Sequence, residues 1–206
     1  MSLAIFLDMD MLHLDSLLLS PLALVASVAI QDVTLVYFVY MQMFKPGHIS
    51  WRDIGFIRDG AMSKALIGLL AGAGIFAIAI GLDLLLQYAG LLPSSGDSGG
   101  AITASGGMQG YILLLIATVV IAPPSEELFF RGYMQSTLVR KWGPVAGIIV
   151  SSLFFAAMHL EPLQFISLFM AGVVLGVLFR KYGLVTAISC HAMNNLLAVT
   201  ALFMLS

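Results

Sequence analysis

Six apolar segments, each about as long as a helix that crosses a bilayer, dominate this sequence. They cover residues 17–44, 65–86, 110–138, 144–160, 163–179 and 184–205. A spanning helix needs about 20 mostly apolar residues, and none of these segments shows the period-two alternation of a membrane β-strand. The sequence therefore predicts an all-α fold, a polytopic bundle of about six transmembrane helices.

Composition leaves no room for a soluble unit beside this bundle. Hydrophobic residues make up 60% of the chain and charged residues 10%, whereas a soluble domain carries about a quarter charged residues. We therefore expect residues 1–206 to form a single integral membrane domain. The formal charge of -2 argues against binding of nucleic acid. The single cysteine, Cys190, excludes an internal disulfide and a cysteine-rich metal site.

The basic residues predict how the bundle is oriented. All nine lie in or beside alternate connections between the segments: Lys45, Arg52, Arg58, Lys64, Arg131, Arg140, Lys141, Arg180 and Lys181. Cytoplasmic connections carry such an excess of Lys and Arg. Both termini, the Gly/Ser-rich loop 93–107 and the turn at residues 161–162 are then extracytoplasmic. The acidic N-terminus has no basic stretch, so it does not predict a cleaved signal peptide.

Two adjacent carboxylates and a guanidinium interrupt the third apolar segment. Ionisable groups at membrane depth are costly and suggest a functional site. Glu127 and Arg131 are four residues apart, so they share a helix face and can pair. Glu126 points about 100° away and is free to act as a general base. Pro123 and Pro124 should kink or restart the helix just before the carboxylates. The alternative is a buried ion pair that only fixes packing.

Three further polar side chains fall at a similar depth. Counting about 1.5 Å per helical residue from the basic markers puts His159, His191 and Asn195 in one band with Glu126, roughly 12 Å deep. Each residue alone could simply bind a neighbouring helix. Together, a carboxylate and an imidazole can activate water, while a second imidazole and a carboxamide can stabilise an oxyanion. This set could hydrolyse an amide without a covalent intermediate, in a polar cavity within the membrane.

The order and spacing of these residues resemble a known family. The three motifs are Glu126-Glu127-x-x-x-Arg131, Phe155-x-x-x-His159 and His191-x-x-x-Asn195. As an ordered set they are similar to the motifs of the CPBP family, the CAAX prenyl protease and bacteriocin-processing (Abi-type) intramembrane proteases. The resemblance covers residues 110–206 and implies a helical fold with an intramembrane cavity. It also implies that Glu126 and His159 position and deprotonate the attacking water.

The same resemblance implies roles for the remaining motif residues. His191 and Asn195 would stabilise the oxyanion, and Glu127 with Arg131 would support the arrangement. The short N-terminal half resembles a compact prokaryotic member, which implies the cytoplasmic membrane of a prokaryotic cell. The expected partners are the lipid bilayer and a peptide or protein substrate with a membrane-associated segment.

A zinc mechanism is the alternative to a metal-free one. Glu126, His159 and His191 could supply the three ligands of an open catalytic zinc. Against this, the motif His-Glu-x-x-His is absent, and the three residues come from different segments. We therefore expect a glutamate-type peptidase without a cofactor, and a chelator that abolishes activity until zinc is added would contradict this.

Two aspartates and the cysteine lie outside the motifs. Asp32 is near the middle of the first segment, and we expect it to face the cavity and to pair with Arg131. Asp83 is near the outer end of the second segment and is expected at the membrane interface. Cys190 lies about 100° round the helix from His191, so it is expected to pack rather than to act as a nucleophile.

Small residues recur at a spacing that favours close helix packing. They are found in Gly68-x-x-x-Gly72 and in Gly172-x-x-x-Gly176, and each pair lies on one helix face.

Two functions other than proteolysis fit the same residues. In a transporter, buried ionisable groups would form a proton or cation pathway, here Glu126, Glu127, His159 and Asp32. In a membrane scaffold, they would only hold helices together. Replacement of Glu126 by Gln separates these functions, because a peptidase should lose turnover, a transporter its coupling and a scaffold its assembly.

Overall fold

The computed structural model describes residues 21–47, 60–91 and 100–205, and within these ranges all regular structure is helical. The all-α class is confirmed. The elements, in chain order, are α2 (Pro21–Val39), η1 (Tyr40–Phe44), α3 (Ala61–Tyr88), α4 (Gly100–Leu115), η2 (Ile116–Ile121), α5 (Ala122–Glu127), η3 (Leu128–Gln135), α6 (Ser136–Met158), η4 (Pro162–Gln164), α7 (Phe165–Tyr182) and α8 (Leu184–Leu205). The turns η1, η2 and η3 are π-helical, and η4 is a 3₁₀ turn.

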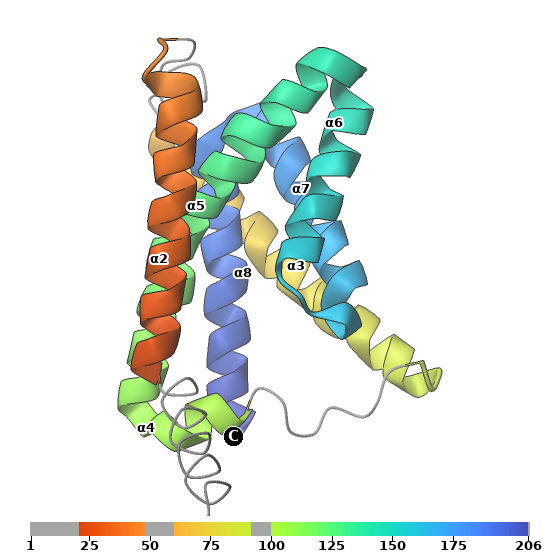
Figure 1. Ribbon diagram of the computed structural model, residues 1–206. Helices are drawn as coiled ribbons and strands as arrows, with labels where there is room; N and C mark the ends of the chain where they lie inside the picture. The colour runs from red at the N-terminus through yellow and green to blue at the C-terminus, as the bar shows by residue number, and fades with distance from the viewer. Residues whose placement is uncertain (1–20, 48–59, 92–99, 206) are drawn as a thin grey trace, which may run out of the picture.

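Five helices of the described residues are long and apolar enough to cross a membrane. One of them, Gly107–Met158, is 52 residues long and contains a sharp bend at Gly143, where φ is 82° and ψ is 171°. Only glycine adopts such a conformation without strain. The chain turns back at this bend (Figure 1). The range Gly107–Met158 therefore holds two of the predicted segments, 110–138 and, except for its last two residues, 144–160.

Some predicted features extend beyond the described residues. Residues 17–20 of the first predicted segment lie outside them, as do residues 93–99 of the predicted loop and much of the first connection. The loop was placed too far along the chain, because residues from Gly100 onward already belong to α4. These first residues form a short helix of their own, because Gly107, with φ of 51° and ψ of -144°, separates them from the helix that is long and apolar enough to cross a membrane.

Glycines let α3 and α8 pack closely. A Cβ atom on Gly72 would collide with the backbone oxygen of Cys190 and lie 2.8 Å from the Cβ of Met193, and Gly68 meets α8 one turn away in the same manner. On α7, a Cβ on Gly172 would lie 3.0 Å from that of Ser152. The predicted role of both glycine pairs in packing is confirmed.

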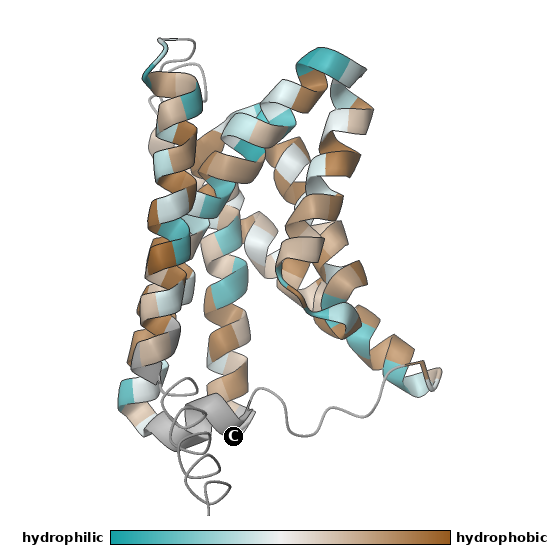
Figure 2. Ribbon diagram, in the orientation of Figure 1, coloured by the Kyte–Doolittle hydropathy of each residue, from teal (hydrophilic) through white to brown (hydrophobic). Residues whose placement is uncertain are grey.

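Polar residues gather inside the bundle, at mid-height. Figure 2 shows hydrophilic bands on α2, α5 and α8 within ribbons that are otherwise apolar. The outward side chains are mostly large and apolar, among them Ile30, Leu70, Val145 and Met204. Near one end of α3, the half-buried Asp83 accepts a hydrogen bond from Ser167 on α7, with 3.2 Å between the oxygens. A functional site is therefore expected where these polar bands lie.

Candidate active site

The backbone is irregular just where the carboxylates occur. The π-helical turn η2 ends at Ile121, and α5 then begins with Pro123 and Pro124 in its first turn. Proline has no amide hydrogen, so the preceding turn loses two of its regular hydrogen bonds. The chain nevertheless stays helical here, because Ile121 and Ala122 both have helical φ and ψ angles, so the prolines coincide with a change from π- to α-helical geometry and not with the predicted kink or restart. A second π-helical turn, η3, follows directly and carries Arg131. Such turns are rare and are often found at functional sites.

Glu127 and Arg131 form a buried ion pair. Arg131 Nε lies 3.3 Å from Glu127 Oε2, and both side chains are 0% exposed. The guanidinium also donates from Nη2 to the carbonyl oxygen of Gly172 on α7, at 3.2 Å, and lies 4.6 Å from the centre of the Phe155 ring. The predicted pairing is confirmed. It fastens α5 to α6 and α7.

His191 on α8 lies between the two carboxylates. Its Nδ1 is 2.9 Å from Glu127 Oε1, and its Nε2 is 4.0 Å from Glu126 Oε2. Because an ionised carboxylate can only accept, Nδ1 is the nitrogen that donates to Glu127. The other ring nitrogen, Nε2, faces Glu126. Glu127 thus joins Arg131 to His191 and fixes the orientation of the imidazole.

His159, at the end of α6, is oriented by its own helix. Its Nδ1 lies 2.8 Å from the carbonyl oxygen of Phe155, one turn earlier. A carbonyl only accepts, so Nδ1 carries the hydrogen and Nε2 is the nitrogen with a free lone pair. The Phe155 ring contacts both imidazoles, with ring centres 4.6 Å from His159 and 5.6 Å from His191. Phe155 therefore packs against both imidazoles and helps to fix their positions.

Asn195 lies one turn beyond His191 on α8 and is held by a hydrogen bond. Its Nδ2 donates to the carbonyl oxygen of Thr118, at 2.9 Å. Asn194 donates to Asn195 Oδ1 across a longer 3.4 Å. Because Thr118 lies in the π-helical turn η2, its backbone is available to an outside donor. Among the residues that the structure describes, the second hydrogen on Asn195 Nδ2 meets no acceptor, so it is available for a ligand.

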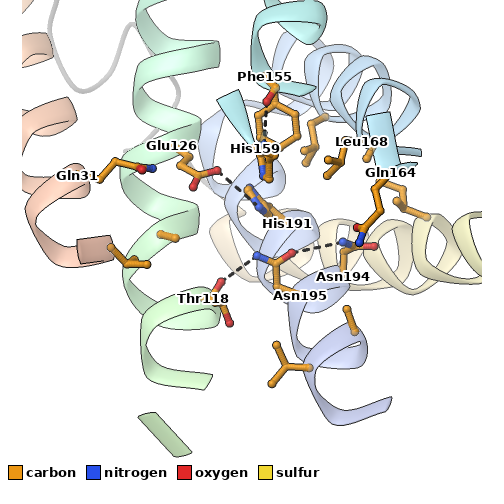
Figure 3. Close-up of a pocket in the computed structure, with 17 residues that line it drawn as sticks. Gln31, Thr118, Glu126, Phe155, His159, Gln164, Leu168, His191, Asn194 and Asn195 are labelled. Carbon is orange, nitrogen blue, oxygen red and sulfur yellow. Dashed lines mark hydrogen bonds and ion pairs between the residues drawn. The ribbon is translucent and has the colours of Figure 1, made fainter. Parts of the chain in front are cut away.

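These residues meet around one cavity, here called the site cavity, of about 340 Å³. Four of the six predicted site residues line it: Glu126, His159, His191 and Asn195. Figure 3 shows them converging from α5, α6 and α8. Glu127 and Arg131 lie behind this surface, where Glu127 contacts the lining residue His191 and Arg131 contacts the lining residue Phe155. The residues predicted from three separate segments are thus brought together.

Asp32 does not make the predicted contact. The prediction that it pairs with Arg131 is wrong, because Asp32 Oδ1 instead accepts from Ser125 Oγ at 2.6 Å, and Arg131 is taken up by Glu127 and Gly172. Asp32 is buried, with 3% of its surface exposed. The partner of Asp32 depends on which side of α2 packs on α5, and the sequence alone does not reveal that side.

Four polar residues of the site cavity were not predicted as site residues: Gln31, Thr118, Gln164 and Asn194. The signal for Gln31 was present, since it stands beside Asp32 in an apolar helix. Thr118 contributes through its backbone, which no side-chain pattern reports. Gln164 ends the short 3₁₀ turn η4 between two helices, and a polar residue in such a connection is ordinary.

The structure also shows where Cys190 lies and whether ligands for a metal ion are grouped together. Cys190 is fully buried in an apolar cluster with Ile75 and Phe155, in agreement with its predicted packing role. Within the described ranges, no group of three or more His, Cys, Asp or Glu side chains is arranged to hold a metal ion.

The fold and the site together define a polytopic helical membrane protein with a glutamate, two histidines and an asparagine around an intramembrane cavity. Residues 108–197 match the family model described as type II CAAX prenyl endopeptidase Rce1-like. Over these residues, 90 of the 206 in the chain, the sequence is similar to CAAX-type endopeptidases. Comparisons with curated proteins and with solved structures gave no match.

Proposed function

We propose that this protein is a glutamate-type intramembrane endopeptidase, which cleaves a membrane-associated peptide or protein with water activated by Glu126 and His159. The observation that carries the proposal is the convergence of Glu126, His159, His191 and Asn195 on one cavity. A carboxylate and an imidazole with a free lone pair lie on one part of its wall. The same cavity also holds the hydrogen-bond donors His191 and Asn195. This is the division of roles that amide hydrolysis needs.

In the first step, a water molecule held by Glu126 and His159 attacks the scissile carbonyl carbon. Glu126 takes one proton as the new C–O bond forms, and the carbonyl becomes a tetrahedral oxyanion. His159 accepts a hydrogen bond from the water through Nε2, because its Nδ1 is occupied by Phe155. The imidazole thereby orients the attacking lone pair. In the second step, Glu126 passes its proton to the leaving nitrogen, and the C–N bond breaks.

The oxyanion is stabilised by Asn195 and His191. Asn195 offers the Nδ2 hydrogen that Thr118 does not use. His191 can donate only from Nε2, since Nδ1 donates to Glu127. The mechanism therefore requires His191 to carry a proton on both nitrogens during turnover. Donors of this kind typically lower a barrier by about 3–4 kcal/mol each.

Glu127 and Arg131 act behind the reacting groups. Arg131 keeps Glu127 ionised through the 3.3 Å ion pair, and Glu127 in turn holds the His191 ring. Among the described residues no arginine or lysine pairs with Glu126, and its ion-pair contact to His191 Nε2 is long, at 4.0 Å, which leaves lone pairs for water. The assignment of Glu126 as the base and of Glu127 as the support rests on this contrast.

The substrate and the orientation form part of the same proposal. A site with apolar walls at membrane depth suits a peptide that has a membrane-associated segment. The basic connections are expected to face the cytoplasm of a prokaryotic cell, with both termini on the opposite side. Cysteines introduced at Lys141 and at Glu161 in a Cys190→Ala background should react with an impermeant maleimide from opposite sides of the membrane. Labelling of both positions from one side would reject this orientation.

Peptide release is the test of the proposed activity. The purified chain, reconstituted in phosphatidylethanolamine and phosphatidylglycerol vesicles, would be supplied with a mixture of quenched-fluorescent peptides with randomised positions. Mass spectrometry would identify the cleaved bonds. Glu126→Gln should lower turnover by about 10²–10⁴-fold, the usual contribution of a general base, without changing the unfolding temperature.

A matched control distinguishes this loss from a general effect of charge removal. Glu161 lies on the exposed turn after α6, so Glu161→Gln should cleave as the wild type does. No cleavage by the wild type in the vesicle assay, or undiminished cleavage by Glu126→Gln, would defeat the proposal.

A further inference from the structure

Helix α2 turns one face toward the site, although it lies outside the segment that matches the family. Val28 and Gln31 line the site cavity. Gln31 and Leu35 line a second, smaller pocket of about 180 Å³, here called the side pocket. Residues 28, 31 and 35 are spaced by three and four, so they form a single helix face. That face is apolar at both ends and carries a carboxamide in the middle.

The two hollows meet at three side chains. Gln31, Glu126 and His159 line both the site cavity and the side pocket. Leu35, Phe130 and Met158 complete the lining of the side pocket. A chain that passes from one hollow to the other must therefore cross between Glu126 and His159, with Gln31 beside it. These are the two residues to which the proposed function assigns the attacking water.

The side-chain carboxamide of Gln31 is available to bind a ligand. Among the described residues its carboxamide has no hydrogen-bond partner, and its side chain is exposed toward the hollows. Figure 3 shows it extending from α2 toward Glu126. A carboxamide offers both a donor and an acceptor. It can therefore match the N–H and C=O of a peptide group, and it carries no charge that would repel Glu126.

Asp32, the next residue, fixes how α2 is turned. It lies about 100° round the helix from Gln31 and accepts the hydrogen bond of Ser125, at 2.6 Å, in a buried position. Ser125 directly precedes Glu126 on α5. The bond thus ties the rotation of α2 to the very turn that carries the base. While it is intact, the face with Val28, Gln31 and Leu35 is directed at Glu126.

From this geometry we infer that Gln31 is a substrate-binding residue. It holds an extended peptide where the chain crosses from the site cavity to the side pocket, and Asp32 is the residue that positions it. Substrate residues on one side of the scissile bond occupy the site cavity. The residue on the other side places its side chain in the side pocket. The inference rests on the proposed peptidase function.

Kinetics on a peptide that the wild type cleaves test the role of Gln31. Gln31→Leu should raise KM by about 3–10-fold, as expected for one hydrogen bond to a neutral group, and leave kcat unchanged, because the bond is made in ground and transition states alike. Gln42 is an exposed glutamine farther along the same helical segment, so Gln42→Leu is the matched control and should not change KM. An unchanged KM for Gln31→Leu overturns the inference.

Cross-linking tests the two-sided path without turnover. In the Glu126→Gln background, a photoreactive benzoylphenylalanine at position 28 or at position 35 would be irradiated with the same peptide. The two positions should label residues on opposite sides of the cleavage site. Labelling of the same side by both positions overturns the path. A wild type that cleaves nothing would instead reject the proposed function, so the two failures can be told apart.

The positioning role of Asp32 has its own measurement. Asp32→Leu should raise KM about as much as Gln31→Leu does, whereas Asp32→Asn, which keeps an oxygen to accept from Ser125, should restore most of the affinity. The double variant should be no worse in KM than Gln31→Leu, because the two residues act through one contact. If Asp32→Leu lowers only the unfolding temperature and leaves KM unchanged, Asp32 is purely structural.

Discussion

The two walls of the site are built differently. The anchored wall, formed by Glu127, Arg131 and His191, consists of charged groups bonded to one another across α5, η3 and α8. The α2 wall, formed by Val28, Gln31 and Leu35, presents neutral groups with a single buried attachment, from Asp32 to Ser125. The segment that matches the family contains the whole anchored wall and none of the α2 wall.

Physical chemistry explains why the walls differ. A buried charge is stable only when it is paired and hydrogen-bonded, so residues that bear the reaction require a fixed network around them. A wall that only contacts substrate can be neutral and loosely held. The contrast suggests that the chemistry resides in the matched segment, and that α2 adapts the site to a particular peptide.

The largest effect on stability is expected from breaking the anchored wall. Arg131→Met leaves Glu127 buried without its cation, and loss of one partner of a buried pair costs about 3–5 kcal/mol. Thermal unfolding of the detergent-solubilised protein would measure the change. Lys141→Met removes an exposed cation at the bend and serves as the control, with a change within about 0.5 kcal/mol. If both variants unfold at the same temperature as the wild type, the ion pair between Glu127 and Arg131 does not stabilise the anchored wall.

The next effect concerns the packing that holds α8, and with it His191, in place. Gly72→Ala puts a methyl group against the Cys190 backbone and Met193, and such overpacking costs about 1–3 kcal/mol. Gly74 lies two residues away on α3 with nothing within 4 Å of its missing Cβ. Gly74→Ala should therefore stabilise α3 slightly, because alanine favours a helix. Equal unfolding temperatures for the two variants would show that α3 and α8 are less closely packed than the structure has them.

A smaller effect on stability separates the two tasks of the anchored wall. In the double variant Glu127→Leu/Arg131→Met, an apolar pair replaces the ions, and such replacements are commonly neutral or stabilising. Its free energy of unfolding should return to within about 1 kcal/mol of the wild type. Peptide cleavage should remain impaired, because His191 has lost its partner. Recovery of both properties would mean that Glu127 has no part in the reaction.

These contrasts also show what sequence can and cannot provide. The spacing of Glu127 and Arg131 was enough to predict their ion pair, since i and i+4 always share a helix face. The depth count brought His159, His191 and Asn195 together with Glu126 because helices of known rise cross one membrane. The partner of Asp32 and the role of Gln31 depend on the rotation of α2 against α5. No local pattern encodes that rotation, and the resemblance to the family did not extend to α2.

The smallest change is expected on removal of metal. Three ligands of a catalytic zinc must converge at about 2.0–2.2 Å from one point, and no trio of His, Cys, Asp or Glu among the described residues is so arranged. In addition, His191 already uses Nδ1 to hold Glu127 and keeps Nε2 4.0 Å from Glu126. Incubation with EDTA or 1,10-phenanthroline should therefore change the rate of peptide cleavage by less than about two-fold, far below the loss expected when an essential metal is withdrawn. Activity that disappears with chelator and returns only with zinc would mean that the anchored wall holds a metal ligand in His191, and that Glu126 serves the metal instead of the water.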